Sequence, residues 1–158
     1  MPLTGYLKID DIPGESQRVD HEDEIDVWGV SWGIEQQSSA VTSRLRRRGR
    51  AEIDPVVVHK QIDAATPYLA DAVERGRVFR EMTLAVRKDS GEAHLDYLVI
   101  TMENVLITSF SFAEETRDGG SVVPAERVAL EADRMTVKYV RLNDDHSAHS
   151  EHEVEIGR

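Results

Sequence analysis

Three histidines near the C-terminus, His146, His149 and His152, recur at every third position. Imidazole nitrogens are good ligands for Zn²⁺, so a histidine tract of this kind is a candidate metal site. From Asn143 onward, however, the chain is polar and shows no strand or helix pattern that would fix the geometry of the ligands. A disordered, solvated tail over residues 143–158 is the stronger interpretation, and no metal ligand is assigned.

Catalytic motifs are absent from the sequence. Nucleophilic catalysis needs a Ser, Thr or Cys with a nearby base, but the chain has no cysteine and no G-x-S-x-G elbow. The HExxH, P-loop and GxGxxG patterns are missing as well. His21 and His59 stand beside acidic or apolar neighbours and are predicted to be surface or structural residues. The sequence therefore predicts no catalytic residue, no cofactor and no enzyme activity.

One short segment is strongly basic in an otherwise acidic chain with a formal net charge of −11. Its five arginines, with no acid among them, are Arg44, Arg46, Arg47, Arg48 and Arg50. They lie in a polar stretch, residues 36–50, that is predicted to be a long exposed loop or an extended hairpin. The acidic balance argues against a nucleic-acid partner, and the aromatic and glycine patterns of phosphate sites are missing. We predict that these arginines contact an acidic surface of another subunit, with a solvated loop as the alternative.

Two tryptophans, Trp28 and Trp32, share one face of a predicted strand over residues 24–34. Such a pair is a candidate stacking platform for a base or a sugar, but burial in a core or an interface is the more common role of tryptophan. The apolar phase of the strand flips at Val27–Trp28, which predicts a bulge or a strand buried on both faces. We place both tryptophans in the structural core.

Residues 59–76 are the one segment with a helical pattern, read as a short first turn followed by a longer helix. Thr66 is the predicted N-cap, Pro67 occupies the first helical position, and Gly76 is placed to end the helix. Leu69 and Val73 lie on its apolar stripe and are candidate core residues. Nearly all other segments with regular patterns are predicted strands.

The predicted fold is mainly β, a small antiparallel β-barrel with one α-helix packed on its side. Strands are predicted over residues 3–9, 24–34, 51–58, 78–86, 94–103, 105–112, 126–131 and 135–142, with a loop over 113–124 and a type II turn at Pro13–Gly14 in which glycine supplies a positive φ. Apolar residues on both faces of the 94–103 strand mean that both faces are covered. Residues 1–142 form one domain.

Targeting signals give little guidance. The N-terminus lacks a basic region followed by an apolar run, so no cleaved signal peptide is expected. No apolar stretch approaches the roughly 20 residues that a membrane-spanning helix needs. The absence of cysteine suits a cytoplasmic protein, and equally one that must survive in an oxidising compartment.

Several stretches together resemble the Hcp (haemolysin-coregulated protein) family, the tube protein of bacterial type VI secretion systems. The matching residues are Tyr6-Leu7-Lys8-Ile9, Asp11-Ile12-Pro13-Gly14-Glu15-Ser16, His21, Glu24-Ile25-Asp26-Val27, Ser31-Trp32-Gly33, Lys60-Gln61-Ile62-Asp63, Thr66-Pro67, Met82-Thr83-Leu84-Ala85-Val86-Arg87-Lys88, Tyr97-Leu98-Val99-Ile100, Glu103-Asn104-Val105-Leu106-Ile107 and Val137-Lys138-Tyr139. The resemblance spans about residues 3–142 in order. The five-arginine segment is more basic than the family leads one to expect, and the histidine-rich tail lies outside the resemblance.

The resemblance implies a β-barrel with one helix on its side that assembles into hexameric rings, which stack into a hollow tube. A contractile sheath drives such a tube out of the cell with a spike (VgrG-like) protein at its tip, and small effectors ride in the lumen. It also implies no cofactor, no nucleic-acid partner and no membrane span. The protein is then cytoplasmic on synthesis and afterwards secreted without a cleaved signal peptide.

Two other interpretations remain open from the residues. A tail-tube protein of a phage or phage-like particle shares the fold and the ring assembly. A small β-barrel enzyme or ligand-binding protein predicts instead a closed monomer or dimer with a polar cleft.

Overall fold

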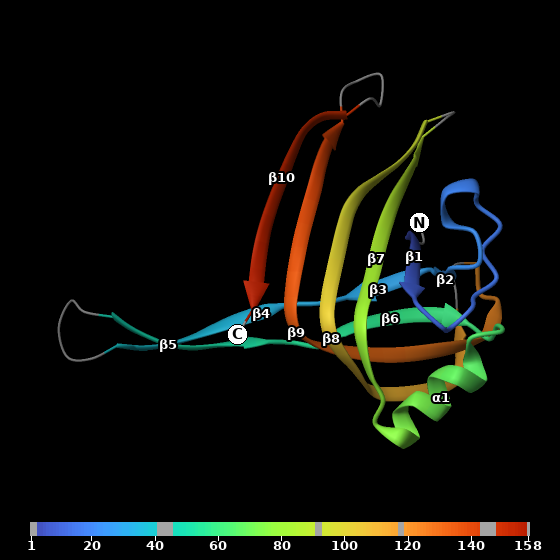
Figure 1. Ribbon diagram of the computed structural model, residues 1–158, viewed down its shortest axis with the longest axis horizontal. Helices are drawn as coiled ribbons and strands as arrows, with labels where there is room; N and C mark the ends of the chain where they lie inside the picture. The colour runs from blue at the N-terminus through green and yellow to red at the C-terminus, as the bar shows by residue number, and fades with distance from the viewer. Residues whose placement is uncertain (1–2, 41–45, 91–92, 117–118, 143–147, 158) are drawn as a thin grey trace.

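The protein is mainly β with a single helix in the part of the chain that the structure, a computed structural model, describes: residues 3–40, 46–90, 93–116, 119–142 and 148–157 (Figure 1). Its elements are β1 Thr4–Ile9, a 3₁₀ turn Val19–His21, β2 Ile25–Val27, β3 Gly29–Ser31, β4 Ile34–Ala40, β5 Arg46–Ile53, β6 Val56–Gln61, α1 Thr66–Arg75, β7 Val78–Ser90, β8 Ala93–Thr116, β9 Val122–Leu142 and β10 Ala148–Gly157. The predicted fold class is confirmed.

The main sheet is antiparallel, with strand order β2-β1-β7-β8-β9-β6-β3 and β10 on the outer side of β9. Its two end strands, β2 and β3, are consecutive in the chain and separated by Trp28 alone. The Trp28 N–H donates to the His59 carbonyl at 2.9 Å, and the Trp28 carbonyl accepts from Leu3 N–H at 3.2 Å. In the part of the chain that the structure describes, no ladder joins β2 to β3, so the predicted barrel is not closed by strand pairing. The flip in apolar phase marks the point where one stretch changes its partner from β1 to β6.

The strands β8 and β9 are long and bent, so that each contributes to two parts of the wall (Figure 1). The first half of β9 pairs with β6 and its second half with β10. The separate strands predicted at 94–103 and 105–112 are one strand, which passes through Asn104 in a left-handed conformation with φ 52°. The loop predicted at 113–124 is largely ladder, because Ala113–Thr116 pairs with Val122–Ala125.

The helix begins and ends close to the predicted positions. Thr66 is its first residue, but the N-cap is Ala65, whose conformation is helical and which makes no side-chain cap. Gly76 ends the helix with φ 64°, and its N–H donates to the Val73 carbonyl. His59 to Gln61, predicted as a first helical turn, belong instead to β6, because the buried residues Val56, Val58 and Lys60 recur with the period of a strand.

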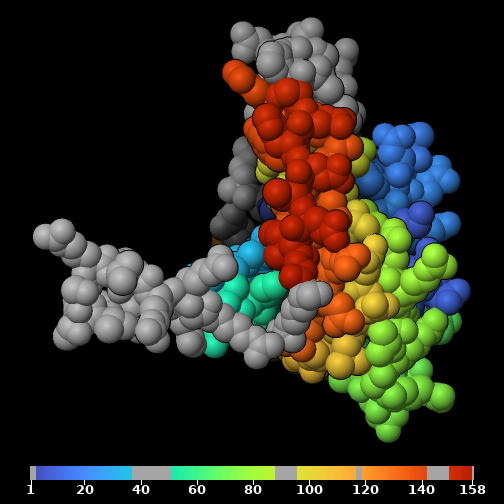
Figure 2. Space-filling model, turned by 60° about the vertical axis from the view of Figure 1, so that its left-hand side comes forward, coloured from blue at the N-terminus to red at the C-terminus, as the bar shows by residue number. Residues whose placement is uncertain are grey.

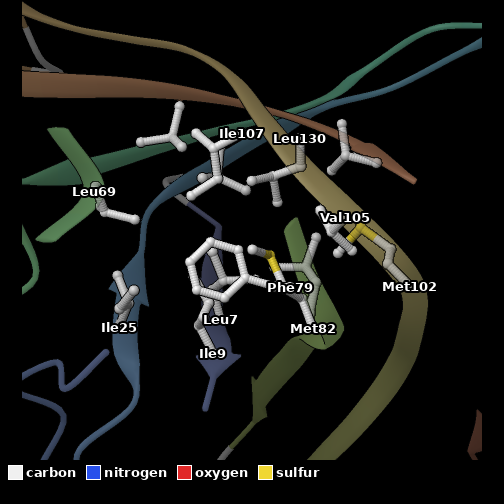
Figure 3. Close-up of a cluster of buried hydrophobic side chains, with 14 of the residues drawn as sticks. Leu7, Ile9, Ile25, Leu69, Phe79, Met82, Met102, Val105, Ile107 and Leu130 are labelled. Carbon is white, nitrogen blue, oxygen red and sulfur yellow. The ribbon is translucent and has the colours of Figure 1, made fainter. Parts of the chain in front are cut away.

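A single apolar cluster fills the space between the helix and the curved sheet (Figure 3). Leu69 of α1 is fully buried in this cluster, and Val73 and Trp32 are partly buried against it. Trp28 is half-buried, and its ring lies 5.3 Å from that of His59 at a tilt of 40°. Of the four predicted core residues, Leu69 thus lies deepest and Trp28 lies at the junction of β2 and β3.

The C-terminal segment was predicted to be disordered, and this is wrong for residues 148–157. These residues form β10, which pairs with β9 from Leu142 to Arg134. The pairing follows from an alternation at the end of the chain, where Val154 and Ile156 share one face and glutamates occupy the other. His152 stacks on Tyr139 with ring centroids 6.5 Å apart; His146 and the side chain of His149 lie outside the described residues.

The polar stretch predicted as a loop or hairpin is a hairpin. Strands β4 and β5 form a separate two-stranded sheet, hereafter the arm, which projects away from the body (Figure 1). Within the described ranges, no helix has the length and apolar character needed to cross a membrane.

Candidate assembly surfaces

Strand β10 leaves one backbone edge open. In the main sheet as described, β10 pairs with β9 on one side, and no strand pairs with its other side. The arm leaves two more open edges, since β4 and β5 pair only with one another. Open edges carry rows of N–H and C=O groups that another strand can pair with, so these edges are candidate contacts with a further chain.

The core-facing side of β9 and β10 continues past the core as an exposed apolar face. Across the ladder, Leu98 lies opposite Tyr139, which lies opposite His152, and in the next row Val137 lies opposite Val154. Val154 is 64% exposed and Tyr139 45% exposed, whereas the same side of the sheet is buried nearer to the helix. We call Tyr139, Val154 and their partly buried neighbours Leu98, Val137 and Ile156 the β10 face; β10 itself lies on the molecular surface (Figure 2).

The opposite side of the same strands is charged. Glu155 Oε1 forms an ion pair with Arg134 Nε at 3.0 Å, and Glu151 Oε1 forms one with Lys138 Nζ at 3.5 Å. These side chains are a third or more exposed, so each pair contributes little to the free energy of unfolding. Strand β10 therefore presents an apolar side, a charged side and an open edge between them.

The arm holds the arginines that the sequence assigns to a subunit contact. The backbone of Arg46, Arg47 and Arg48 pairs with Ala40, Ser39 and Ser38. Arg44 lies outside the described residues, as do the side chains of Arg46, Arg47, Arg48 and Arg50. The structure thus places the basic strand β5 on the projecting arm (Figure 1).

The excursion between β1 and β2, residues 10–24, is fastened to the sheet by His21. Its Nδ1 lies 3.0 Å from Glu24 Oε1, and its Nε2 lies 2.8 Å from Asp96 Oδ2. The His21 ring stacks on Tyr6 with centroids 4.3 Å apart and planes 8° apart. Burial raises the pKa of the Tyr6 phenol, and the charges of Arg18 and Arg87 oppose this rise.

Arg87 holds the other side of this cluster. Its Nε donates to Asp96 Oδ1 at 3.1 Å, and its guanidinium lies 5.6 Å from the centroid of the Tyr6 ring. Burial lowers the pKa of Arg87, but the hydrogen bond and charge of Asp96 outweigh burial, so that the pKa is raised. A permanently charged guanidinium paired in this way is a structural fastening and not a candidate acid or base.

Gly14 in this excursion is required for a reason other than the predicted one. Its φ is not in the left-handed region, so the predicted type II turn with glycine at a positive φ is wrong. Instead Gly14 N–H donates to the Asp23 carbonyl at 2.7 Å, and a Cβ at this position would lie 2.2 Å from the Glu24 carbonyl oxygen. The two backbones approach too closely for any side chain.

A second polar cluster lies beneath the start of α1, with Lys60 and Glu126 fully buried at its centre. Lys60 Nζ contacts a carboxylate oxygen of Glu126, and it lies 2.9 Å from both the Gln61 carbonyl and Asp63 Oδ1. Thr66 Oγ1 donates to the other Glu126 oxygen at 2.5 Å and accepts from Asp63 N–H at 3.0 Å. All three ammonium protons of Lys60 have acceptors, so this cluster ties β6, β9 and the helix together.

A cavity of about 330 Å³ lies beside β1, β2 and the end of β6, with Glu15, Asp26, Trp28 and Asp63 among its lining residues. Burial raises the pKa of Asp26, and the Ser16 hydrogen bond lowers it in part. Within the residues with described side chains, no three His, Asp or Glu side chains are grouped to hold a metal ion. Three carboxylates, those of Glu15, Asp26 and Asp63, thus line this cavity.

The open edge and apolar side of β10 are the features that sequence reasoning missed. Their signal was the alternation of Val154 and Ile156 with glutamates, which the polar composition around it obscured. Lys60 and Glu126 were missed because each looks like an ordinary surface residue until the register that brings them opposite one another is known.

Comparison with known proteins gives consistent results. The family described as "Type VI secretion system effector, Hcp" matches residues 6–139. Protein hcp1 of Pseudomonas aeruginosa is 33% identical over 139 residues, covering 88% of this chain and 84% of that protein.

Solved structures agree in fold. A structure described as a type six secretion system protein superposes with a TM-score of 0.84 at 25% identity, covering 98% of this chain and 92% of the other. Hcp1 from Salmonella typhimurium superposes with a TM-score of 0.72 at 25% identity, covering 94% and 92%.

Proposed function

Because this chain belongs to the Hcp family of type VI secretion proteins, we propose that it is a tube subunit that assembles into hexameric rings. The rings stack into a hollow tube that a contractile sheath expels, with a spike protein at the tip and small effectors carried in the lumen. The family is one of structural, secreted proteins and not of enzymes. The protein in this proposal is made in the cytoplasm and leaves the cell as part of the tube.

The β10 face carries the proposal. A single chain leaves Tyr139 and Val154 exposed on a sheet side that is otherwise core, next to an open strand edge. Aromatic and aliphatic side chains grouped in this way are typical of the centre of an interface between chains. A second copy that packs on this face would bury it, and rotational repetition of the same contact would close a ring.

The arginines of the arm support contact between subunits in a second way. Strand β5 of the arm includes Arg46, Arg47, Arg48 and Arg50, and Arg44 precedes it in the sequence, so this basic segment is attracted to the strongly acidic remainder of another copy. Electrostatic complementarity of this kind speeds association and selects the partner more than it increases affinity. We assign these five residues to a contact between copies of the chain.

Electron microscopy of the purified protein tests the proposal. We expect ring-shaped particles with a central hole, and stacks of rings at high protein concentration. Substitution Val154→Asp places a charge in the centre of the β10 face and should abolish rings while the chain stays folded. The matched control is Val19→Asp, because Val19 is 85% exposed on the 3₁₀ turn and lies outside the β10 face.

Normal rings from the Val154→Asp protein would refute the assignment of the β10 face. Absence of rings from the unsubstituted protein under all conditions, including addition of preformed tube ends, would refute the tube function itself.

A further inference from the structure

We propose that strand β5 in the arm of one copy adds to the open edge of β10 in a second copy. This inference rests on the proposed function, because it names the surface that the arm of one subunit meets on another. The occupant is thus a second copy of this chain.

Two unsatisfied strand edges of the same chain motivate this pairing. The arm is an isolated two-stranded ribbon, and such ribbons are marginally stable in water unless something covers them. Strand β10 spans ten residues and, among the described strands, is paired on one side only. Addition of β5 to β10 would satisfy backbone groups on both edges and turn the ribbon into part of a larger sheet.

The charges of the two strands are opposite in sign. Glutamates occupy positions 151, 153 and 155 of β10, so they share one side of the strand. Glu151 and Glu155 are exposed even though each also pairs with a cation of β9. Arginines occupy positions 46 and 48 of β5, which are two residues apart along the strand. The shift in register between β4 and β5 falls beyond Arg48 and leaves this alternation intact. Both sets have a spacing of two residues, so one register brings both arginines opposite glutamates.

The pairing requires a second chain. In one molecule the arm and β10 belong to separate sheets, and the arm points away from the body (Figure 1). A contact between the arm of one copy and β10 of the next uses two different surfaces, so it is heterologous and continues around a ring or along a stack.

Charge alone would allow a different docking site. The excursion of residues 10–24 also carries several exposed carboxylates, including Glu22. That segment, however, is largely irregular, so it offers acidic charge without a comparable strand edge. A contact through strand addition and a contact through charge alone therefore predict different neighbours for Arg48.

Disulfide trapping distinguishes these neighbours, because the sequence contains no cysteine. The Arg48→Cys chain is co-expressed with a tagged chain carrying Glu151→Cys, Glu153→Cys or Glu155→Cys, and the assembled protein is oxidised. Directly opposed positions on paired strands lie about 4.5–5.5 Å apart between Cα atoms, which suits a disulfide. We expect one of the three β10 positions to give a tagged–untagged dimer in most of the protein, and Glu22→Cys to give none.

A cross-link to Glu22→Cys and to none of the β10 positions would overturn the proposal in favour of contact through charge alone. No cross-link at any position would overturn it as well. The native mass, measured on the same samples, separates this inference from the proposed function. A six-chain particle without a β10 cross-link refutes only the strand addition. A protein that gives no cross-link, stays monomeric and also fails to assemble on preformed tube ends refutes both.

Charge exchange gives a second test that does not depend on oxidation. The double substitution Arg46→Glu and Arg48→Glu should raise the protein concentration needed for assembly at least tenfold. Adding Glu153→Arg and Glu155→Arg on the same chain should restore assembly. Arg75→Glu with Arg80→Glu changes the net charge equally at exposed sites outside both strands and serves as the control. Failure of the exchange to restore assembly, with the cross-links also absent, would confirm that β5 and β10 are not paired.

Discussion

Lys60 on β6 and Glu126 on β9 lie directly opposite one another in the sheet, and both side chains are 0% exposed. Taking two charges out of water costs several kcal/mol for each ion, and only excellent geometry offsets this cost. Here the Lys60 ammonium has three acceptors, and Glu126 accepts from both Lys60 and Thr66. The pair therefore depends on its complete hydrogen bonding, and loss of one member should be far more harmful than loss of both.

Substitution Lys60→Met should lower the free energy of unfolding by about 3–5 kcal/mol, because it leaves Glu126 as a buried charge without its cation. The double substitution Lys60→Met with Glu126→Gln should lose substantially less, since Gln keeps an acceptor for Thr66 and carries no charge. Urea unfolding of both proteins measures the difference. As a control, Arg75→Met removes the exposed pair with Asp71 and should change stability by less than about 1 kcal/mol. Equal losses in the single and double variants would contradict this account of the cluster.

Substitution Gly76→Ala should lower the free energy of unfolding by about 1 kcal/mol, because the left-handed conformation at φ 64° is strained for a residue with a Cβ. An added Cβ meets no atom within 4 Å, so steric overlap does not contribute. Gly76→Asn should lose less than Gly76→Ala, since asparagine tolerates this conformation better. In thermal unfolding, the protein with Gly76 should have the highest midpoint, the Asn variant the next and the Ala variant the lowest. An Ala variant as stable as the protein with Gly76 would contradict a left-handed residue at the end of the helix.

Substitution Gly14→Ala should destabilise the protein by more than Gly76→Ala does. The new Cβ would lie 2.2 Å from the Glu24 carbonyl oxygen, and both segments are backbone that must move apart. That movement would break the bonds from Gly14 N–H to Asp23 and from Ser16 N–H to Glu24. Amide hydrogen exchange should show loss of protection in residues 14–25 while α1 stays protected. Unchanged protection there would contradict the close approach of these backbones.

Substitution Asp26→Asn should remove a pH dependence of stability. Burial raises the pKa of Asp26 above its ordinary value of 3.8, so the folded state binds a proton more readily than the unfolded state. The wild-type protein should then lose stability as pH rises from 3.8 through the folded pKa, and the Asn variant should not show this loss. Because Asp26 is only partly buried and much of the residue remains exposed, the effect should stay below about 1 kcal/mol at neutral pH. The difference between the two proteins, measured by urea unfolding from pH 3.5 to 7, should grow with pH; a difference that shrinks would contradict the sign.

The sequence predicted those features that depend on local patterns. The helix from Thr66 and its end at Gly76 follow from apolar periodicity, a proline at the start and a glycine at the stop. The flip in apolar phase at Val27–Trp28 correctly marked an irregularity, which is the change of partner from β1 to β6.

Features that depend on long-range pairing were harder to predict. The histidine-rich tail gave the wrong answer although its partner is the preceding strand β9, because polar residues around Val154 and Ile156 obscured their alternation. Gly14 was assigned to a turn because sequence cannot reveal that the Glu24 backbone lies against it. The Lys60–Glu126 pair spans 66 residues and becomes visible only with the register of β6 on β9.

The mass of the protein in solution tests the central claim most directly. Light scattering after size exclusion should give a particle near six times 17.8 kDa, about 107 kDa, and Val154→Asp should reduce it to that of one chain. A particle of six chains that Val154→Asp dissociates and Val19→Asp leaves intact is the predicted result. A monomer of 17.8 kDa at every concentration, with no growth on preformed tube ends, would contradict the proposal that this chain is a tube subunit.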